Sequence, residues 1–133
     1  MRILIVDDSR AIQVIIKRTL EKGGFSNLQI KLAHSGLAAL DILQAWQPDL
    51  ILTDWHMPEM SGIELLSELN RQMLTVNVGL ITTETKASRL ELAKQSGVKF
   101  IIHKPFEEEH LIEQVMRFLP KPPSGDSLSA YQQ

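Results

Sequence analysis

Five short aliphatic runs alternate with helix-like stretches, and this alternation is the feature that most constrains the fold. The runs lie at residues 3–6, 28–33, 50–53, 76–82 and 99–103. Nearly continuous apolar runs of this length are typical of parallel strands that helices cover on both faces. The run at 28–33 (LQIKLA) alternates more between apolar and polar residues, so we expect it near an edge of the sheet.

Apolar residues at helical spacing follow each run. The predicted apolar faces consist of Ile12, Ile15, Ile16 and Leu20; of Leu37, Ala38, Leu40 and Leu43; of Leu65, Leu66 and Leu69; of Leu90 and Ala93; and of Leu111, Ile112, Val115, Met116 and Leu119. Gly23-Gly24 would end the first helix, and Ser61 with Glu64 has the spacing of a capping box. We expect helices also over 36–46, 86–96 and 107–119. A βα pattern repeated five times predicts an α/β fold, a doubly wound (βα)5 sandwich with right-handed crossovers.

Length and composition set limits on the class of protein. A chain of 133 residues with 44% hydrophobic residues can bury one core, and the absence of cysteine excludes disulfides and thiolate sites. The net charge of -2 without a basic cluster argues against nucleic acid as a direct partner. No apolar segment approaches the roughly 20 residues that span a bilayer. We expect a soluble, cytoplasmic domain over residues 1–119, followed over 120–133 by a Pro/Ser-rich disordered tail or linker.

Polar residues follow four of the predicted strands. Asp7 and Asp8 come after the first run and Asp54 after the third, while Thr82 ends the fourth run and Lys104 follows the fifth. Since the carboxyl ends of parallel strands lie along one edge of a sheet, we expect these side chains to converge there.

Each of these residues has an ordinary structural explanation when it is taken alone. Asp8 or Ser9 could cap the first helix, Asp54 and Thr82 could satisfy backbone groups in turns, and Lys104 could be solvated. Taken together, three carboxylates would repel one another unless a cation lay among them. Oxygen ligands with room for water favour Mg²⁺, and a metal, an ammonium group and a hydroxyl beside a carboxylate make a phosphoryl-transfer site.

The motifs that carry these residues resemble a known family. ILIVDDS, AHSGLAAL, LILTDWHMPEMSGIELL, the LIT that ends the fourth run and HKPF occur in the order and spacing of the receiver domain of two-component response regulators. The resemblance covers residues 2 to about 119 and is strongest to the single-domain, CheY-like type. It implies a flavodoxin-like sheet with strand order 2-1-3-4-5.

The resemblance also implies a role for each site residue. Asp54 would accept the phosphoryl group. Asp8 would bind Mg²⁺ directly and Asp7 through water, with Asp54 and the backbone carbonyl of His56 completing the protein ligands. Thr82 and Lys104 would contact the phosphoryl group. Lys104-Pro105 matches a position where the family often has a cis peptide, and Met57-Pro58 with Gly62 matches the turn into the third helix.

Four further positions are compared with the family. His56 and Glu84 stand where the family tunes the lifetime of the phosphoryl group, or they are exposed loop residues. Ile101 stands where the family usually has the Tyr or Phe of its switch, and Phe100, one residue away in a strand, would point to the opposite face. Ser61 replaces an Asp that is frequent in the family.

The expected function is a phosphorylation-dependent signalling switch that is not an enzyme with a separate substrate. The phosphoryl donor would be a sensor histidine kinase or a phosphotransfer protein, and a downstream protein would bind a face around residues 86–118, with a phosphorylation-dependent dimer also open. The alternatives are a receiver domain cut from a longer response regulator or hybrid kinase, and a pseudo-receiver that is never phosphorylated. A haloacid-dehalogenase-type phosphatase is disfavoured, because it needs an acidic residue where this chain has His56.

Overall fold

The computed structural model describes residues 1–120 and has a central five-stranded sheet. The strands are β1 (Arg2–Val6), β2 (Gln29–Ala33), β3 (Leu50–Thr53), β4 (Asn77–Thr82) and β5 (Phe100–His103). All neighbouring pairs are parallel, and the order across the sheet is β2-β1-β3-β4-β5. The predicted α/β class and strand order are confirmed, and β2 lies at an edge as its alternating sequence indicates.

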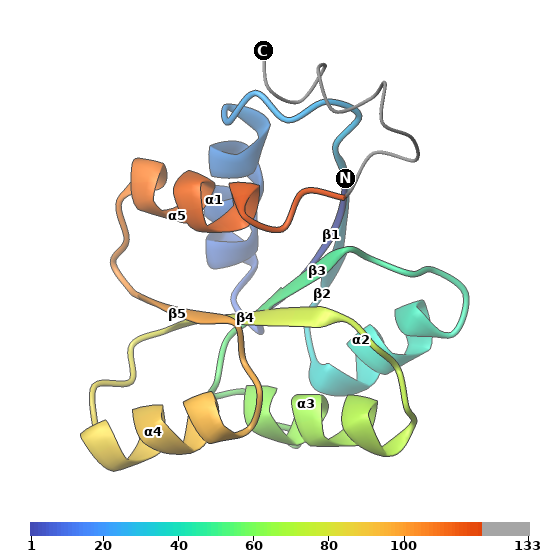
Figure 1. The fold of residues 1–133 in the computed structure, drawn as a ribbon, viewed down its shortest axis with the longest axis vertical. Helices are drawn as coiled ribbons and strands as arrows, with labels where there is room; N and C mark the ends of the chain where they lie inside the picture. The colour runs from blue at the N-terminus through green and yellow to red at the C-terminus, as the bar shows by residue number, and fades with distance from the viewer. Residues whose placement is uncertain (121–133) are drawn as a thin grey trace.

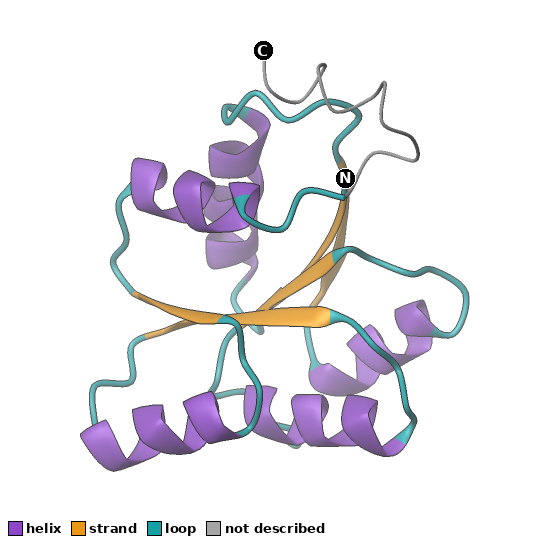
Figure 2. Ribbon diagram, in the orientation of Figure 1, coloured by secondary structure: helices purple, strands orange, loops and turns teal. Residues whose placement is uncertain are grey.

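One helix follows each strand. They are α1 (Arg10–Glu21), α2 (Gly36–Leu43), α3 (Gly62–Arg71), α4 (Ala87–Gln95) and α5 (Glu108–Met116). Helices α1 and α5 cover one face of the sheet, and α2, α3 and α4 cover the other (Figure 1). The ribbon coloured by element shows the sheet as a twisted layer between the two helical layers (Figure 2).

The core is divided by the sheet into apolar clusters on its two faces. Ile3, Ile5, Leu50 and Leu52 pack with α1 and α5, whereas Leu4, Val6 and Ile51 pack with α2 and α3. Alternate residues of the central strands therefore serve opposite faces, which explains why their sequences are apolar throughout. In the described range no helix is long and apolar enough to cross a membrane.

Some predicted helical faces were wrong in detail. Ile15 and Leu37 are each 50% exposed and Met116 is 43% exposed. Ile16 and Val115 are buried, and an α-helix turns by about 100° per residue, so the neighbouring Ile15 and Met116 lie on the flank of the buried stripe.

Two helices are also shorter than predicted. The helix expected over 36–46 ends at Leu43, and the helix expected over 107–119 ends at Met116, with Arg117 as its C-cap. Leu119 therefore lies beyond α5. The predicted tail from residue 121 onward lies outside the described residues.

Candidate functional site

The strand register brings the predicted site residues to one edge of the sheet. Val6 in β1 pairs with Thr53 in β3, so Asp7 and Asp54 leave neighbouring strands at the same level. Thr82, the last residue of β4, pairs with His103 of β5, and Lys104 follows directly after His103. Four distant segments thus meet at the carboxyl end of the sheet.

Three carboxylates cluster at this edge. Asp7, Asp8 and Asp54 each offer an oxygen, and these oxygens lie within 4.8 Å of one another. Asp7 is 1% exposed, whereas Asp8 is exposed to solvent. Water can therefore reach the cluster from the Asp8 side.

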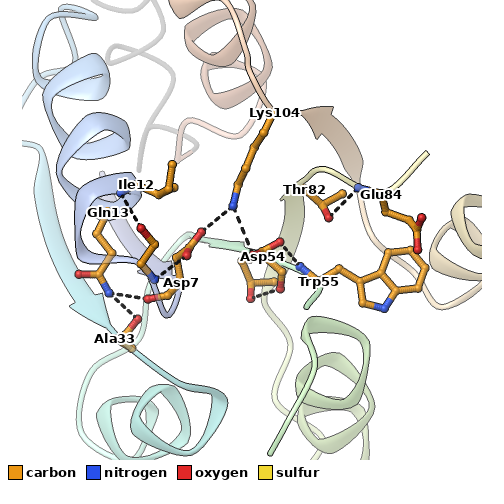
Figure 3. A network of polar contacts seen from close by, with 11 residues as sticks. Asp7, Ile12, Gln13, Ala33, Asp54, Trp55, Thr82, Glu84 and Lys104 are labelled. Carbon is orange, nitrogen blue, oxygen red and sulfur yellow. Dashed lines mark hydrogen bonds and ion pairs between the residues drawn. The ribbon is translucent and has the colours of Figure 1, made fainter. Parts of the chain in front are cut away.

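Lys104 supplies a positive charge between two of the carboxylates. Its Nζ atom lies 2.9 Å from Asp7 Oδ2 and 3.3 Å from Asp54 Oδ2 (Figure 3). The side chain of Lys104 is 13% exposed, which rules out the alternative of a solvated surface lysine. The Lys104-Pro105 peptide is cis, as the resemblance implied.

The loop after β1 holds the first aspartate pair in place. Ser9 is the N-cap of α1, because its hydroxyl accepts a hydrogen bond from the Ile12 backbone N–H. The Ser9 N–H in turn donates to Asp7 Oδ1 at 2.9 Å. Capping is therefore done by Ser9, and Asp7 keeps its second oxygen for Lys104.

The loop after β3 holds Asp54 at the start of a tight turn. The Trp55 N–H donates to Asp54 Oδ1 at 2.7 Å, and the Gly62 N–H donates to the Trp55 carbonyl at 2.8 Å. A Cβ on Gly62 would lie 2.3 Å from the Asp54 carbonyl oxygen. The start of α3 thus approaches the backbone of Asp54 so closely that only glycine fits there. The predicted capping box of Ser61 and Glu64 is confirmed.

Thr82 closes the site on the β4 side. It is fully buried, its hydroxyl accepts a hydrogen bond from the Glu84 N–H at 3.2 Å, and its carbonyl accepts one from the Lys104 N–H. Figure 3 shows Thr82 at the same edge as Asp54 and Lys104. A hydroxyl and an ammonium group thus flank the carboxylate from the two last strands.

His56 and Glu84 contact each other across the mouth of the site. His56 Nε2 lies 3.3 Å from Glu84 Oε1, and Arg89 Nη1 in α4 lies 2.8 Å from the same oxygen. The Arg89 hydrogen bond, followed by that from the Lys86 N–H, lowers the pKa of Glu84 to about 2. Glu84 is only 11% exposed, so the alternative of two exposed loop residues is wrong for Glu84. Arg89 is a partner that sequence reasoning missed.

Ile101 and Phe100 point to opposite faces of β5, as predicted. Ile101 packs with Trp55, Leu80 and Leu90 under α4. The Phe100 ring belongs to the α1–α5 side, where it lies over Gly79 and packs against Phe118. Phe100 therefore does not occupy the position of the missing switch aromatic.

Gln13 is a second site residue that sequence reasoning missed. It is 4% exposed on the face of α1 that meets the sheet, and its side-chain amide donates to the Asp7 and Ala33 carbonyls. The available signal was its spacing, since Gln13, Ile16 and Leu20 lie three and four residues apart on the buried stripe.

The donor set fits a hard divalent cation. Three carboxylate oxygens within 4.8 Å, with one side open to water, match the oxygen ligands and partial hydration that Mg²⁺ prefers. The Lys104 ammonium and the Thr82 hydroxyl place a positive charge and a hydrogen-bond donor beside the Asp54 carboxylate. The arrangement can support phosphoryl transfer to Asp54.

Comparisons with known proteins agree with this geometry. The family model described as "Response regulator receiver domain" matches residues 3–116. The chain is 39% identical over 117 residues to the chemotaxis protein CheY-3 of Vibrio cholerae, covering 86% of this chain and 88% of the relative. It is 32% identical to the sporulation initiation phosphotransferase F of Bacillus subtilis, covering 90% of this chain and 94% of the relative.

A solved structure agrees as well. The chemotaxis protein CheY4 of Vibrio cholerae superposes with a TM-score of 0.79 at 30% identity, covering 89% of this chain and 98% of that protein. The sheet order, the clustered aspartates and the family match over residues 3–116 lead to one conclusion. The chain belongs to the response regulator receiver domain family, the signal-receiving module of two-component systems.

Proposed function

We propose that the chain is a phosphorylation-dependent signalling switch whose phosphoryl acceptor is Asp54. The observation that carries the proposal is the position of the Lys104 ammonium, 2.9 Å from Asp7 and 3.3 Å from Asp54 at the edge of a three-carboxylate cluster. A structural ion pair would need one carboxylate, whereas three carboxylates with one ammonium leave a net negative site that a divalent cation would neutralise.

The proposed metal ligands are Asp8 directly, Asp7 through water, Asp54 and the backbone carbonyl of His56. A bound Mg²⁺ would screen the carboxylates from the incoming phosphoryl group and stabilise its oxygens. Lys104 and Thr82 would contact other oxygens of the same phosphoryl group. Negative charge on these oxygens has to be stabilised during transfer.

In the proposed transfer, an Asp54 carboxylate oxygen attacks the phosphorus atom of a phosphohistidine. The P–N bond breaks, its electron pair stays on the imidazole, and that nitrogen takes up a proton from solvent. The product is an aspartyl phosphate, which water later hydrolyses to restore the carboxylate and release phosphate. The chain would thus catalyse its own phosphorylation and dephosphorylation without turning over a separate substrate.

The donor would be a histidine kinase or a phosphotransfer protein in the cytoplasm, and a downstream protein would bind the face around residues 86–118. Thr82 and Ile101 would pass the signal to that face, and His56 with Glu84 would set the phosphoryl lifetime. The similarity to a chemotaxis protein and to a sporulation phosphotransferase supports signalling without choosing between these outputs.

The test is the intact mass of the protein after incubation with acetyl phosphate and Mg²⁺, beside an Asp54→Asn control. We expect one labile phosphoryl group on the wild type, cleaved by both acid and base as an acyl phosphate is, that requires Mg²⁺ and is absent from the control. Phosphorylation that persists in Asp54→Asn would identify a different nucleophile. A wild type that neither binds Mg²⁺ nor accepts a phosphoryl group from acetyl phosphate or a phosphohistidine donor would favour the pseudo-receiver.

A further inference from the structure

We propose that Gln13 is a positioning residue for the two aspartates of the loop after β1, and through them for the divalent cation. This inference rests on the proposed function, because it assigns a role in the same metal site. Gln13 does not touch the cluster with its own oxygen. It acts through the backbone that carries Asp7 and Asp8.

The contacts of Gln13 are specific to that backbone. Its Nε2 donates one hydrogen bond to the Asp7 carbonyl at 2.8 Å and another to the Ala33 carbonyl at 2.9 Å (Figure 3). The Ala33 carbonyl also accepts a hydrogen bond from the Asp7 N–H at 3.1 Å. Gln13 therefore contacts the Asp7 carbonyl directly. It also contacts the Ala33 carbonyl at the end of β2, which in turn holds the Asp7 N–H.

The Asp7 carbonyl belongs to the peptide plane that joins Asp7 to Asp8. The orientation of this plane decides how the two neighbouring carboxylates diverge, because the chain has only two soft dihedral angles per residue. Asp7 points inward to Lys104, while Asp8 lies exposed and still has an oxygen within 4.8 Å of the other two carboxylates. Fixing the plane keeps this arrangement.

Another buried polar residue of α1 behaves differently. Thr19 is 1% exposed, and its hydroxyl donates to the Ile15 carbonyl in its own helix at 2.8 Å. Such a bond satisfies a polar group without linking elements. Gln13 instead uses both amide hydrogens on carbonyls outside its helix, at the ends of β1 and β2. Thr19 is therefore a matched control for burial and polarity without contact to the site.

The experiment compares Mg²⁺ binding by calorimetry at pH 7 in the full chain, its Gln13→Met variant and its Thr19→Val variant. Methionine keeps the length and burial of Gln13 but removes both hydrogen-bond donors. We expect Gln13→Met to weaken Mg²⁺ binding by about 10- to 100-fold, as for other groups that orient metal ligands. Thr19→Val should keep the wild-type affinity. Urea unfolding of all three proteins separates this effect from a loss of stability, which both substitutions share.

The outcomes distinguish the two proposals. If the wild type binds no Mg²⁺, the proposed function and the role of Gln13 fall together. If the wild type binds and Gln13→Met binds equally well, only the role of Gln13 is overturned. If Gln13→Met does not fold, Gln13→Asn carries the test, because its shorter amide cannot reach both carbonyls. Unchanged affinity in a folded Gln13→Asn would overturn the inference, and weaker binding would support it.

Discussion

Lys104 forms ion pairs with two of the three carboxylates of the site. Its ammonium contacts two carboxylates from different strands, Asp7 at 2.9 Å and Asp54 at 3.3 Å, and it is largely shielded from solvent. Interactions between such shielded charges are stronger than those on the surface, because water screens them less. In the proposed transfer, this ammonium would contact a phosphoryl oxygen on Asp54.

A Lys104→Met substitution should separate metal binding from phosphoryl transfer. Removing one positive charge leaves the carboxylate cluster more negative, so Mg²⁺ should bind at least as tightly as in the wild type. Phosphorylation by acetyl phosphate should slow by about 100- to 1,000-fold, the usual effect of deleting one stabilising donor.

The control for this prediction is Lys99→Met, which removes an exposed lysine just before β5. Its Mg²⁺ affinity and phosphorylation rate should match those of the wild type. Equal rates in Lys104→Met and Lys99→Met would contradict a direct role of the Lys104 ammonium in the transfer.

At the scale of elements, two helices begin with the same Ser-Gly pair but meet different surroundings. Ser35 caps α2 ahead of Gly36, and Ser61 caps α3 ahead of Gly62. A Cβ on Gly36 would meet the side chain of Met60, 2.7 Å from its sulfur and 3.0 Å from its Cβ, with no backbone atom among its nearest neighbours. A Cβ on Gly62 would instead meet the backbone of Asp54. The helix that begins at Gly62 therefore packs directly against the backbone of Asp54, whereas α2 has no such contact at Gly36.

We expect Gly62→Ala to destabilise the fold by about 1–3 kcal/mol, as overpacking does, and also to slow the phosphorylation of Asp54. Gly36→Ala should have a much smaller effect on both, because the Met60 side chain can move aside. Urea unfolding and acetyl phosphate kinetics on the two variants give the comparison. A Gly62→Ala protein with wild-type kinetics would show that the acceptor loop tolerates a backbone shift.

At the scale of the whole molecule, the sheet holds the site while the helical layers complete the core. Both faces of the central strands are buried, so the carboxyl ends of β1, β3, β4 and β5 are held by the whole core and not by local turns alone. The last buried residues along the described chain are Leu111 and Val115, with Phe118 packed against their cluster. Within the described residues 1–120, the buried core thus extends to Val115, and Phe118 packs against it.

Truncation tests this extent of the core. A chain that ends at residue 119 should unfold with a free energy within about 0.5 kcal/mol of the full chain, as for changes away from packed groups. A chain that ends at residue 110 should not fold cooperatively, because it lacks buried Leu111 and Val115. Truncating a single buried leucine to alanine already lowers the free energy of unfolding by about 2–5 kcal/mol. Loss of more than about 1 kcal/mol on removing 120–133 would place part of that segment in the folded domain.

The sequence by itself determined the fold class and the convergence of the site. Aliphatic runs ended by Asp7, Asp54, Thr82 and Lys104 predict a parallel sheet whose polar residues meet at one edge, because parallel strands point the same way. The capping roles of Ser9 and Ser61 could also be anticipated, since a helix N-cap depends on residues three positions away.

The tertiary structure decided what depends on partners distant in the chain. Neither the two carbonyls held by Gln13 nor the Arg89–Glu84–His56 contacts follow from local spacing, because they depend on how loops and helices pack. The exposure of Ile15 and Met116 likewise depends on how each helix is rotated about its axis against the sheet. Apolar spacing alone does not specify this rotation to within one residue. Local periodicity specifies elements and their ends, whereas the packing between elements selects which polar groups meet.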